Sequence, residues 1–203
     1  MDRLTIEELP LRRFGALSAF PVRTLGTAGM RIVGSRCSRT ARLLAERDRD
    51  GECSERLGRD MVAHATAVLE SVGRVPAATA SMCLAALLHD FDDFFPGADV
   101  ARLGDVGYDY RTVRIVDELT FDPKRTDRGT DYWSWLEWIA QHASGEARAV
   151  KYAAMSLNVA DSAHWRSVAA RLGEKVPRRA RERLAAAAER MRKAIPDDAL
   201  ILP

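Results

Sequence analysis

The chain has 203 residues, of which 47% are hydrophobic and 30% are charged. This apolar content is enough for a buried core, so it excludes a wholly disordered chain, and the length favours one domain over two. The formal net charge is only +2, which argues against a general polyanion-binding protein, so we expect no nucleic-acid partner.

No segment approaches the ~20 consecutive apolar residues that a membrane span needs, so we expect no membrane partner. The first residues include several charges and lack the continuous apolar segment of a signal peptide. The three cysteines, Cys37, Cys53 and Cys83, are odd in number and match no zinc-binding spacing. Together these features predict a reduced protein of the cytoplasm.

Hydrophobic periodicity predicts an almost entirely helical chain. Residues 1–36 have scattered Gly and Pro and weak periodicity, and we treat them as an N-terminal extension of unknown role. Residues 37–203 are expected to form one helical domain that ends in a helix rich in Ala and Arg. The predicted helices cover residues 58–72, 77–91, 108–119, 132–142, 145–163 and 177–194.

The segments between these helices carry turn and capping signals. Residues 120–131 are polar, contain Pro and Gly and are expected to form a loop, at the end of which Asp131 could cap the next helix. The chain has no alternation of strands and helices and no glycine-rich phosphate loop, which argues against a Rossmann or P-loop enzyme. The predicted fold class is therefore all-α.

The candidate site centres on His89 and Asp90, which follow an apolar run. A carboxylate beside buried helices must be paired or bound to a cation. His64 lies 25 residues upstream, on a helix that a short turn joins to the 77–91 helix, and antiparallel pairing can bring it towards His89 and Asp90. Two imidazoles and a carboxylate are suitable ligands for Mn²⁺, Fe²⁺ or Zn²⁺. The alternative is a solvated His-Asp pair at a helix end.

Asp92 and Asp93 lie just beyond the His-Asp pair and are candidate catalytic residues. Near a metal ion, such carboxylates can orient or deprotonate a water molecule. Without a cation, three carboxylates this close together in the sequence would repel one another. The alternative is that Asp92 and Asp93 are surface acids at a helix end.

At residues 85–90 the sequence reads AALLHD, which resembles the core motif of the HD-domain metal-dependent phosphohydrolases. The resemblance is closest to the RelA/SpoT-type hydrolase domain and the small alarmone hydrolases, and it covers roughly residues 40–165. Residues 116–120 resemble the family's helix after the HD pair, and residues 149–153 resemble the start of its last metal-ligand helix. The resemblance implies an HD-domain helical bundle in which His64, His89 and Asp90 bind the metal.

The family's fourth ligand, an Asp, can be aligned in two registers. In the first register Ala154 stands at the Asp position, and Lys151 and Asn158 match the family's pattern on the same helix. In the second register Asp161 is the ligand, although it lies seven residues further along, about 10 Å on a helix. A slipped helix, a site with three protein ligands and an Asp-to-Ala substitution all remain open.

Other residues bear on the substrate. The resemblance makes Lys151 and Asn158 candidate substrate ligands, and Arg59 lies close enough to the first metal ligand to contact a phosphate. The family's acidic pair is only half present, because Asp93 stands at its first position and Phe94 at its second. The basic run at residues 178–183 is typical of a solvated helix face, because it lacks the interleaved aromatic residues of an RNA-binding surface. The tryptophans, including Trp165, are more typical of packing than of base stacking.

The resemblance implies a metal-dependent phosphohydrolase that acts on a nucleotide or a related phosphate ester, an alarmone being one candidate. The implied cofactor is Mn²⁺, with Fe²⁺ or Zn²⁺ as alternatives. The departures at Ala154 and Phe94 favour a second hypothesis, a catalytically degraded HD protein that binds a nucleotide or a protein partner without turnover. A mixed-valent di-iron oxygenase of the same fold would need more His and Asp ligands than the sequence offers.

Overall fold

The computed structural model describes residues 21–25, 27–57 and 59–195. In these residues all regular structure is helical, apart from one isolated bridge between Pro21 and Thr79, so the predicted all-α fold class is confirmed. No helix in this part of the chain combines the length and apolar character of a membrane span. The elements are η2 (Val22–Thr24), α1 (Thr27–Arg47), α2 (Glu52–Leu57), α3 (Met61–Gly73), α4 (Ala80–Leu87), α5 (Phe91–Phe94), α6 (Arg102–Asp105), α7 (Tyr110–Leu119), η3 (Thr126–Arg128), α8 (Tyr132–His142), α9 (Gly145–Ala160), α10 (Ser162–Leu172) and α11 (Lys175–Lys193).

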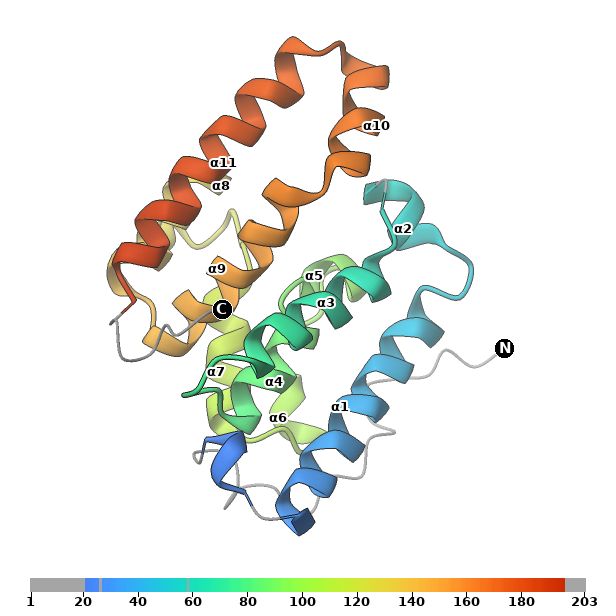
Figure 1. The fold of residues 1–203 in the computed structure, drawn as a ribbon, viewed down its shortest axis with the longest axis vertical. Coiled ribbons are helices and arrows are strands. Elements are labelled where there is room, and N and C mark those ends of the chain that lie inside the picture. Colours follow the sequence, from blue (N-terminus) through green and yellow to red (C-terminus); the bar gives the residue numbers. More distant parts are fainter. Residues whose placement is uncertain (1–20, 26, 58, 196–203) are drawn as a thin grey trace.

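Helix α4 lies at the centre of the core. Every one of its residues is buried, as expected for a helix that is apolar all round. Helices α1, α3, α7 and α9 pack around it, and α3 and α4 lie side by side in Figure 1. The surrounding helices are amphipathic and turn their apolar faces inward. In α3, for example, Met61, Ala65, Val68 and Val72 are buried at helical spacing.

Helix α4 is shorter than the predicted helix over residues 77–91. It begins after Thr79, whose hydroxyl accepts a hydrogen bond from the backbone N–H of Met82, and it ends at Leu87. Thr is favoured at the N-cap of a helix because its hydroxyl satisfies a backbone N–H group that would otherwise have no partner. His89 and Asp90 therefore lie in the turn between α4 and α5, and not inside a helix.

The predicted helix over residues 145–163 is divided into two. Helix α9 ends at Ala160, α10 begins at Ser162, and Asp161 is the residue between them. The Asp161 carboxylate accepts a hydrogen bond from the backbone N–H of His164 at 2.9 Å. Asp is among the strongest residues for capping a helix N-terminus, so at this position it starts a new helix in place of continuing the old one.

The N-terminal boundary also differs from the prediction. Helix α1 runs from Thr27 to Arg47 and packs on α3 and α4. A domain boundary between residues 36 and 37 would therefore cut a helix of the core, and Val33 is already buried in it. Residues 1–20 of the predicted extension lie outside the described residues.

The C-terminal part of the chain forms a helical hairpin. Helix α11 packs along α9 and α8, and α10 packs on α11. Gly173 lies in the turn between α10 and α11 with a φ of 76°, a backbone conformation that favours glycine. This turn forms the upper end of the molecule in Figure 1. At the start of α8, Asp131 caps the helix as predicted, because its carboxylate accepts the backbone N–H groups of Trp133 and Ser134.

Candidate metal centre

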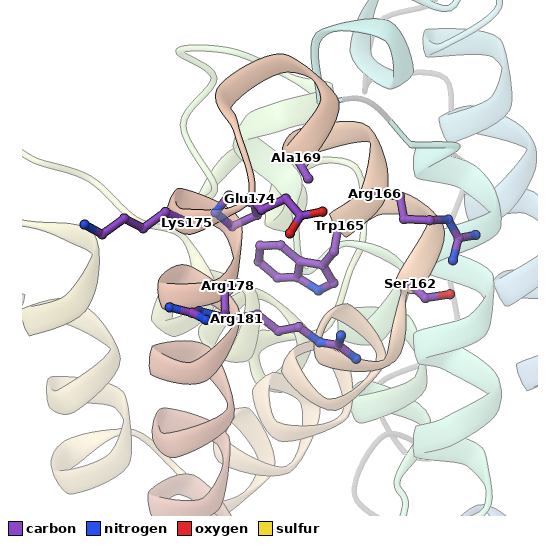
Figure 2. Close-up of a pocket in the computed structure, with 9 residues that line it drawn as sticks. Ser162, Trp165, Arg166, Ala169, Glu174, Lys175, Arg178 and Arg181 are labelled. Atoms are coloured by element: carbon purple, nitrogen blue, oxygen red, sulfur yellow. The ribbon is translucent and has the colours of Figure 1, made fainter.

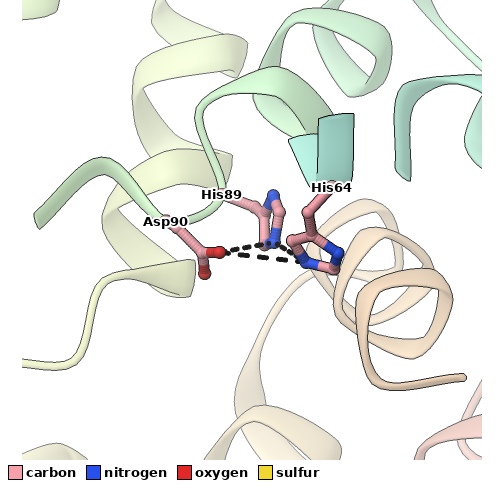
Figure 3. Close-up of side chains that lie close together, drawn as sticks. All are labelled: His64, His89 and Asp90. Carbon is pink, nitrogen blue, oxygen red and sulfur yellow. Dashed lines mark hydrogen bonds and ion pairs between the residues drawn. The ribbon is translucent and has the colours of Figure 1, made fainter. Parts of the chain in front are cut away.

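Three side chains that the sequence predicts to converge do lie together. His64 comes from α3, and His89 and Asp90 come from the turn after α4 (Figure 3). His89 Nε2 lies 3.2 Å from His64 Nε2 and 3.1 Å from Asp90 Oδ2, and His64 Nε2 lies 3.9 Å from the same oxygen. One donor atom from each residue therefore faces a common point, and these three residues could hold a metal ion.

The hydrogen bonds of His89 orient its ring for ligation. Its Nδ1 lies 2.8 Å from the carbonyl oxygen of Ala86, a group near the C-terminus of α4. A carbonyl only accepts, so Nδ1 carries the proton and donates it there. When a ring with this tautomer is neutral, its lone pair is on Nε2, which faces His64 and Asp90. This arrangement is common for metal-ligating histidines.

Burial keeps His64 in its neutral form. Its side chain is only 9% exposed, and burial, with the neighbouring His89 and Arg59 adding to the effect, lowers the pKa of His64 to about 3. A neutral imidazole is the form that binds a metal ion. At neutral pH the site therefore offers His64 without the need to remove a proton.

Asp90 is held ionised by the groups around it. Burial of this carboxylate acts to raise its pKa, but its contact with His89 and the positive charges of Lys151 and Arg59 outweigh that effect and hold the pKa well below its usual range. Arg59 Nη2 lies 3.3 Å from Asp90 Oδ2. The cluster thus combines two nitrogen donors with one anionic oxygen, a donor set that suits Mn²⁺, Fe²⁺ and Zn²⁺.

A cavity of about 260 Å³ opens beside the cluster. It contains both signs of charge: Arg59 and Lys151 supply positive charge, and Asp92 and Asp93 supply negative charge. Its remaining walls are apolar or aromatic in large part. The full lining is Arg59, His89, Asp90, Phe91, Asp92, Asp93, Leu119, Thr120, Phe121, Tyr132, Trp135, Lys151, Ala154 and Asn158.

Both terminal nitrogens of the Arg59 guanidinium group have a partner. One terminal nitrogen pairs with Asp90, and the other donates to the side-chain oxygen of Asn158. Asn158 stands on α9, so this contact ties the segment before α3 to the far side of the cavity. The predicted substrate residues Arg59, Lys151 and Asn158 are therefore brought together, as are Asp92 and Asp93 on α5.

The structure separates the two candidates for the fourth ligand position. Ala154 lies in the cavity wall and is 1% exposed. Asp161 is not a member of the metal-ligating group among the described residues, and its carboxylate caps α10 instead. The register that aligns Lys151, Ala154 and Asn158 is the one that places all three residues on the cavity.

Sequence reasoning missed the aromatic side of the site. Lys151 is buried, and its amine lies 4.4 Å from the ring centre of Trp135 and 5.7 Å from that of Tyr132. Such cation–π contacts help to hold a buried ammonium group that has lost its water. The sequence favours a packing role for the tryptophans of α8, and no signal in the local sequence connects them to a lysine on another helix.

Neither a protein-family model, nor a curated protein, nor a solved structure matches this chain.

Proposed function

We propose that this protein is a metal-dependent phosphohydrolase of the HD-domain type, acting on a nucleotide or a related phosphate ester. The observation that carries the proposal is the convergence of His64, His89 and Asp90 beside a cavity with cationic and acidic walls. Phosphate esters are anions, and their hydrolysis needs positive charge on the phosphate and a base for the attacking water. The cavity offers both kinds of group.

The residues present fit a divalent metal ion. His64 Nε2, His89 Nε2 and Asp90 Oδ2 would hold it, and two neutral imidazoles with one carboxylate leave positions for water and substrate. Such an ion polarises a phosphoryl oxygen and lowers the pKa of a water molecule. The resemblance to alarmone hydrolases favours Mn²⁺, and the same donors suit Fe²⁺ or Zn²⁺.

The protein's own side chains would share the rest of the work. Arg59 and Lys151 bind and orient the phosphate, and both are pre-positioned, one by Asn158 and the other by Trp135. Asp93, with Asp92 beside it, accepts a proton from the attacking water. Cations that are already fixed in place need not move when negative charge builds up on the phosphate, so they can stabilise the transition state strongly.

A turnover screen tests this function. The purified protein is incubated with Mn²⁺ and a panel of nucleoside mono-, di- and triphosphates and alarmones, and phosphate or pyrophosphate release is measured together with bound metal. We expect release from at least one substrate class, and loss of both metal and turnover in His89→Ala. The matched control is His142→Ala, because His142 is exposed and outside the cluster. Turnover that persists in metal-free His89→Ala would refute the assignment.

Ala154 favours a second candidate function. A methyl group in the cavity wall, where a fourth ligand would suit a divalent ion, is compatible with a nucleotide-binding protein that has lost turnover. That protein would bind a nucleotide in the same cavity without releasing phosphate. Binding without product under Mn²⁺ therefore selects this second function over the first.

A further inference from the structure

A second cavity, of about 570 Å³, lies between α10 and α11. No residue lines both this hollow and the metal-site cavity. Figure 2 shows the indole of Trp165 standing in the middle of the hollow, with Arg181 extending beneath the ring. The volume is within the range of small-ligand sites, about 300–1,000 Å³. The hollow is therefore large enough for a ligand of its own.

Trp165 is held in place from one edge. Its Nε1–H donates to the backbone carbonyl of Asn158 at 2.7 Å, which satisfies the only polar group of the ring. The side chain is half-buried, so part of the indole is free to contact another molecule. A fixed, half-exposed indole is a ready surface on which a second planar ring can stack.

The rim of the hollow is strongly basic. Arg166 comes from α10, and Lys175, Arg178 and Arg181 come from α11, whereas Glu174 is the only acid in the lining. Neither Arg166 nor Arg178 forms an ion pair with any described residue. Arg181 donates through Nε to the carbonyl of Val159 at 2.8 Å, which fixes its guanidinium at the edge of the hollow.

The fold thus adds basic residues of α11 to Trp165 and its sequence neighbour Arg166 on α10. Trp165 lies on α10, and the basic run begins at Arg178 on α11. An indole provides a stacking face for any nucleobase, and the planar guanidinium group matches the geometry of a phosphate. We propose that this hollow binds a nucleoside monophosphate, with the base on Trp165 and the phosphate among the arginines.

Calorimetric titration with AMP and GMP tests the proposal on the full chain, in EDTA so that the metal-site cavity is left without its ion. We expect saturable binding of AMP and GMP, and weaker binding of inorganic phosphate alone. Arg166→Glu should weaken the affinity for AMP by about tenfold, which corresponds to the loss of one charge-assisted hydrogen bond. Arg171→Glu is the matched control, because it makes the same charge change on an exposed residue of α10 outside the lining. Its affinity should equal that of the wild type.

A variant that gains affinity provides a control for folding, because a folding defect would lower the affinity for AMP. Glu174→Gln removes the one acid from the lining and should tighten AMP binding, whereas Trp165→Leu should abolish it. The site is independent of the proposed hydrolase, so binding should persist in His89→Ala. The proposal would be overturned if AMP did not bind at millimolar concentration. It would also be overturned if His89→Ala removed the binding while Arg166→Glu and Glu174→Gln left it unchanged.

Discussion

Replacing Ala154 with Asp is the most direct test of the metal-site geometry. Ala154 stands on α9 between Lys151 and Asn158, three residues after one and four before the other, so all three share a helix face. That face borders the cavity next to the His-His-Asp cluster. A carboxylate at position 154 would therefore enter the cavity that His89 and Asp90 also line.

The size of the effect depends on whether metal is present. Without metal, a buried carboxylate with incomplete hydrogen bonding costs about 1–3 kcal/mol in the free energy of unfolding. With saturating metal, each tenfold gain in affinity adds about 1.4 kcal/mol to that free energy. Ala154→Asp should therefore be less stable than the wild type in EDTA, regain that loss in Mn²⁺, and bind Mn²⁺ more tightly.

Urea unfolding with and without Mn²⁺ measures the stability change, and calorimetric titration with Mn²⁺ measures the affinity. Ala154→Asn is the matched control, because it buries a similar polar group without the negative charge and should lose stability in both conditions. Asp161→Asn should leave the affinity unchanged, since Asn also caps helices well. An unchanged Mn²⁺ affinity in a folded Ala154→Asp protein, with a loss of affinity in Asp161→Asn, would refute the geometric argument.

Two further predictions concern stability and thiol chemistry. Asp109 caps α7 and accepts hydrogen bonds from the buried hydroxyls of Ser81 and Thr112. Asp109→Ala should therefore lower the free energy of unfolding by about 2–4 kcal/mol. A change below about 1 kcal/mol in a urea titration would contradict this prediction. Burial raises the pKa of the Cys37 thiol to about 12 and that of Cys83 to about 11, so a disulfide reagent at pH 8 should label neither until urea unfolds the chain. Both pKa values exceed the usual 9.0. The contribution of the two protonated thiols to the free energy of unfolding should therefore be fully present below pH 9 and be lost as the pH rises towards 12.

Local sequence patterns predict much of the fold and the heart of the site. Apolar residues at helical spacing predict α3, α7 and α8, because the face that they form must be buried. Asp131 predicts the start of α8, because a capping carboxylate acts within one turn. The convergence of His64 with His89 and Asp90 follows from two helices joined by a short turn, which can only pack antiparallel.

Where two local preferences compete, the pattern alone is not decisive. Residues 145–163 have the composition of one helix, yet the cap at Asp161 divides them into α9 and α10. Thr79 likewise starts α4 later than residue 77, where the predicted helix begins. The turn that follows Leu87 places His89 and Asp90 on the cavity. At Asp161 and at Thr79, a side chain that satisfies a backbone group outweighs the apolar periodicity.

The sequence by itself determined the helical class and the convergence of His64, His89 and Asp90 at the candidate metal site, because those depend on contacts between neighbouring segments. Only the tertiary structure decided which residues complete the two cavities. Lys151 contacts Trp135 on another helix, Arg59 contacts Asn158 across 99 positions, and Trp165 and Arg181 line the same hollow from two different helices. Such pairs are set by how whole helices pack, because a side chain carries no local signal of a partner that the chain brings to it from far away.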